Sequence, residues 1–177
     1  MAGPHWEVRS ARDASPNISW NETGQTFLEN ARIKVNAIRK FTGHCILADD
    51  SGLQVDALNG APGVWSSNYA GVEGDSGANN KKLIEELSSV PAEKRTARFV
   101  CTLLFVDESG EEQVFTGECH GKILTSARGE NGFGYDPLFE VAEKNGRTMA
   151  ELTAAEKNEI SHRALAMAKW NRFIEHP

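Results

Sequence analysis

A long, largely apolar segment, followed by a short polar turn and a second extended segment, constrains this fold more than any other feature. Within residues 95–106, apolar side chains recur at every second position, at Ala97, Phe99, Cys101 and Leu103. This alternation is typical of a strand that buries one face. A polar turn over residues 108–111 contains Gly110 and leads into a second extended segment over residues 113–124. The pattern predicts two antiparallel strands joined as a hairpin.

Helix-capping residues mark further elements on both sides of this hairpin. Thr26 and Glu29 form a capping box, in which each side chain satisfies a free amide of the first helical turn. Thr153 and Glu156 form a second box, and Ser161 stands where it caps a last helix. We therefore expect a helix before the hairpin and helices at the C-terminal end of the chain.

Shorter patterns predict the remaining elements. Residues 45–48 are apolar and residues 53–57 alternate, so we expect two short consecutive strands there, followed by a helix over residues 79–87. Short strands are also expected near the start of the chain, at Trp6, Val8 and Ile18. Because helices interleave with strands and a hairpin, the fold class is α/β, with a mixed sheet. The 177 residues are expected to form one domain, spanning residues 1–177.

Composition narrows the classes of partner. The chain has 19 basic and 25 acidic residues, a net charge of −6, which argues against a nucleic-acid partner because such proteins present a basic face. The longest apolar run, residues 100–106, is far shorter than the ~20 residues of a membrane span, so no membrane partner is expected. Three cysteines without a CxxC pair favour a reducing, cytoplasmic location.

Two adjacent carboxylates interrupt an apolar stretch in Ala48-Asp49-Asp50-Ser51-Gly52-Leu53. One interpretation is a simple turn, since Asp, Ser and Gly are common turn residues. The other is a divalent-cation site, because carboxylates flanked by apolar residues need a partner that offsets their desolvation. Glu22, in the loop before the first long helix, is a further candidate carboxylate, although an exposed loop residue without a function is the more common case.

A glycine-rich loop over residues 129–137 contains two aromatic side chains. Glycine lets a backbone approach a ligand closely, and Phe133 and Tyr135 offer ring faces on which a base stacks. Asp136 is placed to accept a hydrogen bond from a ring N–H. The alternative is a tight connection whose aromatics fill the core.

Three donors cluster at the start of the C-terminal helices. Lys157, His162 and Arg163 lie within seven residues, where a helix N-terminus also favours anions. Arg donates and never accepts, so this group suits a keto oxygen better than an amino group. The alternative is solvated charge on a helix cap.

Together, four segments resemble the inosine/xanthosine triphosphate pyrophosphatase family. They are ETGQTFLENARIK, ADDSGLQVDALNGAPGVWSS, NGFGYDPLF and AELTAAEKNEISHRALA, in this order from Glu22 to Ala166. The resemblance implies hydrolysis of non-standard purine nucleoside triphosphates (ITP, dITP, XTP) to the monophosphate and pyrophosphate, with Mg²⁺. It also implies a curved mixed sheet with flanking helices, two lobes around a nucleotide cleft, and a homodimer.

The resemblance also implies a role for each matching residue. Asp50 matches the catalytic acid that binds Mg²⁺, Glu22 the second metal-binding carboxylate, and Ser51 a substrate contact. The base-binding positions are matched by Phe133, Gly134, Tyr135, Asp136, Lys157, His162 and Arg163.

One departure from the family pattern lies at the start of the chain. Family members begin with an apolar strand and a Thr/Ser-Gly-Asn-x-x-Lys loop that grips the triphosphate, and residues 1–21 contain neither that loop nor a lysine. We therefore expect an N-terminally shortened form that lacks one strand and its phosphate clamp. The missing loop leaves one alternative open, a relative that binds nucleotide or a partner with little or no catalysis. A stack on Phe133 and Tyr135 tolerates any base, which leaves a second alternative: a hydrolase of another nucleotide, such as a modified pyrimidine triphosphate.

Overall fold

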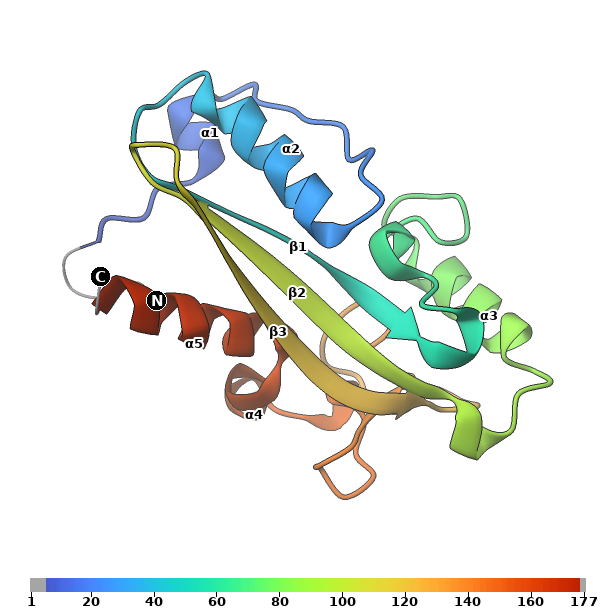
Figure 1. Ribbon diagram of the computed structural model, residues 1–177. Coiled ribbons are helices and arrows are strands. Elements are labelled where there is room, and N and C mark those ends of the chain that lie inside the picture. The colour runs from blue at the N-terminus through green and yellow to red at the C-terminus, as the bar shows by residue number, and fades with distance from the viewer. Residues whose placement is uncertain (1–5, 176–177) are drawn as a thin grey trace.

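The computed structural model describes residues 6–175 and is built on a four-stranded sheet in the order β1-β2-β3-β4 (Figure 1). The strands are β1 (Ile46–Val55), β2 (Thr96–Val106), β3 (Glu112–Ile123) and β4 (Phe139–Val141). The expected hairpin is confirmed, because β2 pairs antiparallel with β3 in a continuous register that sets Leu104 opposite Val114. The expected α/β class is confirmed as well.

The strand pairing differs from the mixed sheet that was expected. Each pair of neighbouring strands in residues 6–175 is antiparallel. A parallel neighbour needs a crossover that returns the chain to the starting end of the sheet. Here the connection from β1 to β2 re-enters at the end where β1 stops, so Val55 lies opposite Ala97.

The two short strands expected over residues 45–57 are one strand, β1. Asp49, Asp50 and Ser51 stay in register with Leu103, Thr102 and Cys101 of β2, so the acidic pair is not a turn. Polar side chains are tolerated inside a strand when each has a hydrogen-bond partner, and those partners come from elements far away in sequence.

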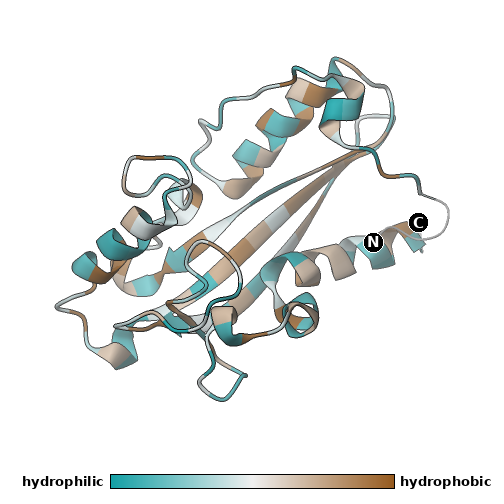
Figure 2. Cartoon of the chain, turned by 180° about the vertical axis from the view of Figure 1, so that it is seen from behind, coloured by the Kyte–Doolittle hydropathy of each residue, from teal (hydrophilic) through white to brown (hydrophobic). Residues whose placement is uncertain are grey.

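Two helices cover opposite faces of the sheet (Figure 1). Helix α2 (Phe27–Arg39) starts at the expected Thr26–Glu29 capping box. It packs Ala31 and Val35 against apolar side chains of β1 and β2, among them Ile46 and Leu104. Helix α5 (His162–Glu175) packs Ala166 and Trp170 against the other face. Figure 2 shows the mixed hydropathy of α2 that this one-sided packing requires, with brown and teal residues along the same helix.

Two further helices pack against the end of the sheet that contains Val55, Ala97 and Ile123. Helix α3 (Ser76–Glu86) buries Leu83, and helix α4 (Ala154–Ile160) starts at the expected capping box of Thr153 and Glu156. Four short 3₁₀ helices complete the connections within the described residues: η1 (Asp56–Leu58), η2 (Gly63–Trp65), η3 (Ala92–Lys94) and η4 (Met149–Glu151). A core of Leu53, Phe99, Tyr135 and Leu138, among others, joins these elements to the sheet.

The first described residues do not form the strands expected at Trp6, Val8 and Ile18. They contain a four-residue helix, α1 (Ala11–Ala14), between irregular segments. Trp6 instead stacks edge-on against Phe105 and Trp170, with ring centroids 6.0 and 6.3 Å away. These aromatic contacts of Trp6 hold the segment against the rest of the protein, although its backbone does not pair with a strand. No helix in residues 6–175 has the length and apolarity to cross a membrane.

Candidate active site

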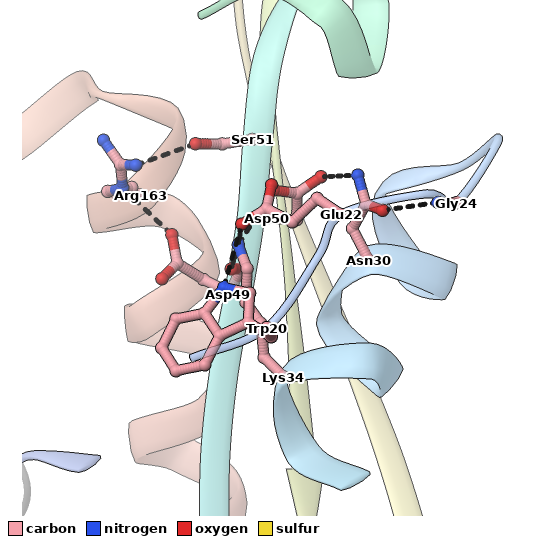
Figure 3. Close-up of polar contacts among 9 residues, drawn as sticks. All are labelled: Trp20, Glu22, Gly24, Asn30, Lys34, Asp49, Asp50, Ser51 and Arg163. Carbon is pink, nitrogen blue, oxygen red and sulfur yellow. Dashed lines mark hydrogen bonds and ion pairs between the residues drawn. The ribbon is translucent and has the colours of Figure 1, made fainter. Parts of the chain in front are cut away.

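Strand β1 sends neighbouring polar side chains to opposite faces of the sheet (Figure 3). Asp50 continues the row of Ile46 and Ala48, which face α2, whereas Asp49 and Ser51 point toward α5. This alternation follows from the two-residue repeat of an extended chain. The adjacent carboxylates therefore belong to two different groups of side chains.

On the α2 side, Asp50 is the centre of a nearly buried polar cluster. Asp50 is 7% exposed, and its Oδ2 accepts a hydrogen bond from Asn30 Nδ2 at 3.1 Å. Lys34 Nζ lies 3.0 Å from Asp50 Oδ1 and 3.1 Å from Glu22 Oε1. Asn30 and Lys34 are one helical turn apart on α2, so the same helix face supplies both donors.

The environment shifts both charged groups of this cluster. Burial raises the pKa of Asp50, and the hydrogen bonds from Lys34 and Asn30 offset only part of that rise. Burial lowers the pKa of Lys34, but its contacts with Asp50 and then Glu22 outweigh burial and raise it overall. Lys34 therefore remains protonated and positively charged, and Asp50 is a stronger proton acceptor than an exposed aspartate.

Whether this cluster suits Mg²⁺ depends on its oxygen donors. Asp50 and Glu22 already share one cation, the Lys34 ammonium, so their oxygens converge. Residues 6–175 hold no group of three or more His, Cys, Asp or Glu side chains arranged to bind a metal. Two carboxylates fit Mg²⁺, which usually takes one or two from the protein and completes its shell with water and substrate phosphates.

On the opposite face of the sheet from α2, a cavity of about 1170 Å³ opens between the glycine-rich loop and helices α4 and α5. It is lined by five of the predicted base-binding residues: Phe133, Asp136, Lys157, His162 and Arg163. A cavity of this size is ample for a purine nucleoside. The structure therefore brings together residues that are up to 30 positions apart in sequence.

Within the loop, the two aromatics have different roles. Phe133 is 72% exposed at the cavity, whereas Tyr135 is only 4% exposed and its hydroxyl donates to the Ser66 carbonyl oxygen at 2.9 Å. The Tyr135 ring is packed in the core and does not line the cavity, so the geometry favours Phe133 as the residue that stacks on a base. Gly134 does not line the cavity; its carbonyl oxygen accepts from Asn80 of α3 at 3.0 Å, which fixes the loop.

Asp136 and Lys157 form an ion pair at the cavity wall, with Lys157 Nζ 2.8 Å from Asp136 Oδ2. This ion pair explains why position 132 of the loop is a glycine. A Cβ at Gly132, where φ is +91°, would collide with both charged side chains. Only glycine accepts that backbone angle freely and leaves room for the pair.

His162 and Arg163 occupy the cavity wall nearest to β1. The His162 ring stacks on Phe99 at a centroid distance of 5.1 Å, and burial, followed by the charge of Arg163, lowers its pKa to about 4. The imidazole is therefore neutral at pH 7, and its buried Nδ1 has no hydrogen-bond partner among residues 6–175. Arg163 Nε lies 3.1 Å from Asp49 Oδ2, and its Nη2 lies 2.8 Å from Ser51 Oγ.

The structure thus sorts the predicted residues into two groups. Glu22 and Asp50 meet on the α2 side, the cavity residues meet on the α5 side, and Ser51 joins the second group through Arg163. Sequence reasoning missed Asn30, Lys34 and Asp49. The spacing of Asn30 and Lys34 on a predicted helix was the available signal, but only the fold shows that this helix face meets Asp50.

Comparison with known proteins places this fold and site in a family. The profile of the Ham1 family matches residues 1–173. A dITP/XTP pyrophosphatase of Bacillus licheniformis is 48% identical over 170 residues, covering 96% of this chain and 86% of the relative. One from Listeria monocytogenes is 53% identical, covering 95% and 82%.

Solved structures agree with the sequence match. The Staphylococcus aureus Ham1 protein superposes with a TM-score of 0.91 at 41% identity, covering 98% of this chain and 88% of that one. A nucleoside-triphosphatase, also titled dITP/XTP pyrophosphatase, from Mycobacterium abscessus gives 0.76 at 46% identity, covering 88% and 79%. The chain is an α/β protein with a buried carboxylate–lysine cluster beside a ligand-sized cavity. It belongs to the Ham1 family, which confirms the family resemblance of the four segments.

Proposed function

We propose that this chain hydrolyses non-standard purine nucleoside triphosphates, such as dITP, XTP and ITP, to the monophosphate and pyrophosphate. The relatives named above are dITP/XTP pyrophosphatases, and this chain covers more than four fifths of the two described. The single observation that carries the proposal is a buried acid, Asp50, whose sequence neighbours Asp49 and Ser51 bind Arg163 in the wall of a base-sized cavity.

Asp50 acts as the general base. Its carboxylate takes the proton from a water molecule whose oxygen attacks the α-phosphorus, and the bond from that phosphorus to the α–β bridging oxygen breaks as pyrophosphate leaves. Burial of Asp50 raises its affinity for this proton. Glu22 and Asp50 would hold Mg²⁺, which neutralises charge that develops on the phosphoryl oxygens.

The base binds in the cavity on the far side of β1. Phe133 stacks on the purine, and neutral His162 and charged Arg163 face its edge. The Arg163 guanidinium only donates hydrogen bonds. A keto oxygen of the purine accepts such a bond, whereas an amino group would place two donors against each other. In the described sheet β1 is an edge strand, so a triphosphate can pass around it from the cavity to Asp50.

The test is pyrophosphate release in the presence of Mg²⁺. We expect fast release from ITP, dITP and XTP, slow release from GTP and ATP, and loss of turnover in Asp50→Asn. Asp56→Asn is the matched control, because Asp56 is an exposed carboxylate that pairs with Arg98 outside the site. A fully active Asp50→Asn protein contradicts the mechanism.

Two other outcomes identify the remaining alternatives. Folded protein that binds ITP in calorimetry but releases no pyrophosphate is a nucleotide-binding relative without catalysis. Equal or faster hydrolysis of a modified pyrimidine triphosphate shows that the stack on Phe133 accepts any base and that His162 and Arg163 do not select a purine.

The domain organisation, the oligomeric state and the location of the enzyme are also proposed. We infer one domain over residues 1–177, a homodimer, and a cytoplasmic location, in which the free thiols of all three cysteines are stable. Trp65, which is 46% exposed on η2, is the proposed dimer contact. Light scattering of wild type and Trp65→Ser tests the dimer: a monomeric wild type, or a variant that dimerises equally well, contradicts that contact.

A further inference from the structure

Lys34 occupies the place of a bound cation. Its ammonium lies 3.0 Å from Asp50 Oδ1, 3.1 Å from Glu22 Oε1 and 2.8 Å from the carbonyl oxygen of Asp49. The Lys34 side chain is 15% exposed, and that of Asp50 is 9% exposed. Three oxygens satisfy the three donors of an ammonium, so Lys34 is fully coordinated in this arrangement.

The oxygens that hold Lys34 are the ones available to a metal. The second oxygen of Asp50, Oδ2, already accepts from Asn30, which leaves Oδ1 as the oxygen to coordinate a cation. Glu22 is held in the same arrangement, because Trp20 Nε1 donates to the Glu22 oxygen that Lys34 contacts, at 3.2 Å. An ammonium and a divalent ion cannot share these oxygens, because their positive charges repel at such short range.

We propose that Lys34 is an exchangeable cation: it fills the metal position in the nucleotide-free protein and leaves when metal and nucleotide enter together. This proposal deepens the proposed function of the same site. A displaced ammonium that is this buried needs a new anionic partner, and its four-carbon stem allows it to move. The triphosphate supplies that partner. Metal and triphosphate therefore bind cooperatively, with Lys34 as the positioning residue that couples them.

The proposal has a consequence for each ligand alone. Mg²⁺ without nucleotide must displace Lys34 and leave it unpaired, so it binds weakly. A triphosphate pulls Lys34 away from the carboxylates and thereby strengthens metal binding. Because such coupling is reciprocal, Mg²⁺ strengthens nucleotide binding by the same factor.

Calorimetric titration of MgCl₂ into wild type and Lys34→Met tests the exchange without turnover. We expect Lys34→Met to bind Mg²⁺ alone at least about tenfold more tightly, since ~1.4 kcal/mol corresponds to tenfold. Lys122→Met is the matched control, because Lys122 pairs with Glu140 at 3.0 Å outside the cluster. Its affinity for Mg²⁺ should equal that of wild type.

A second titration measures the coupling, with the non-hydrolysable α,β-methylene analogue of ITP. In wild type, saturating analogue should raise the affinity for Mg²⁺ at least about tenfold, and in Lys34→Met the enhancement should be smaller, because only the direct bonds between the metal and the phosphates remain. Lys34→Arg keeps the cation and should keep weak binding of Mg²⁺ alone.

Equal or weaker Mg²⁺ binding by folded Lys34→Met overturns the exchange, as does the absence of Mg²⁺ binding in every variant with and without the analogue. The proposed function fails separately, by turnover in Asp50→Asn. The titration of Mg²⁺ alone involves no nucleotide, so the two results are independent.

Discussion

Arg163 and Asp49 join the C-terminal helix α5 to strand β1, which contains Asp50, with Nε of Arg163 lying 3.1 Å from Oδ2 of Asp49. The same guanidinium also donates to Ser51, so Arg163 grips the two residues on either side of Asp50. Arg163, which is proposed to face the purine, is therefore fixed to the strand segment that contains Asp50, the proposed general base. Its position depends on Asp49 as well as on helix α5.

Asp49→Asn should reduce selectivity for keto purines. The amide weakens the pair that orients Arg163, so kcat/KM for ITP should fall about three- to tenfold and the ratio of ITP to ATP hydrolysis should fall with it. The effect is modest because both side chains are nearly half exposed and such pairs are worth ~1 kcal/mol. Glu112→Gln, which breaks the exposed pair with Arg32, is the control. An unchanged ITP-to-ATP ratio would show that Asp49 does not position Arg163.

Phe133→Ala should weaken nucleotide binding, whereas Tyr135→Phe should not. Loss of a stack costs ~1–3 kcal/mol, so KM for ITP should rise at least about fivefold in Phe133→Ala with little change in stability. Tyr135→Phe removes the bond to Ser66 and should lower the free energy of unfolding by ~1 kcal/mol without changing KM. Steady-state kinetics and urea unfolding of both variants measure the contrast. The reverse pattern would mean that Tyr135, not Phe133, contacts the base.

How far the sequence predicts this structure depends on whether a signal is local. The capping boxes at Thr26 and Thr153 act over a few residues, and the structure contains both. The strand over residues 96–106 also forms, but it is buried on both faces from Phe99 to Val106 and not on one face only. Asp49 and Asp50 resemble a turn by composition, and only the donors from α2 and α5 make them stable inside a strand. Local patterns identify elements, but they do not show which distant side chains will satisfy a buried polar group.

The residues of the candidate site also divide into those that local patterns identify and those whose position depends on distant contacts. The motifs singled out Asp50, Phe133 and His162, which the structure places in the buried cluster and at the cavity, but they left open whether Tyr135 binds a base or fills the core. An aromatic residue in a glycine-rich loop is compatible with base binding and with packing in the core, and burial alone decides between them. Lys34 was missed because a lysine on an amphipathic helix usually faces solvent. Its inward direction depends on the position of β1 beside α2.

His162 should make stability depend on pH in the acidic range. Its pKa in the folded protein is about 4, below the ordinary value of 6.5, so the unfolded chain binds the additional proton between these values. The free energy of unfolding should therefore be highest above pH 6.5 and fall as the pH drops toward 4, by ~3 kcal/mol from this group. Urea unfolding of wild type and His162→Gln from pH 4 to 8 measures the difference. A wild-type-minus-variant difference that does not change with pH would contradict a buried neutral imidazole.

Asn30 connects the loop that carries Glu22 to the buried acid. Its Oδ1 accepts from the Gly24 amide at 2.8 Å, and its Nδ2 donates to Asp50, while its side chain is almost completely buried. Asn30→Ala leaves both groups without a partner and should lower the free energy of unfolding by ~2–4 kcal/mol. Asn30→Asp keeps the acceptor for Gly24 but sets a second carboxylate against Asp50. It should therefore retain more stability than Asn30→Ala and still lose most turnover. Urea unfolding and pyrophosphate release separate the two roles: if Asn30→Asp is as active as wild type, the donor to Asp50 has no part in catalysis, and Asn30 only holds the loop.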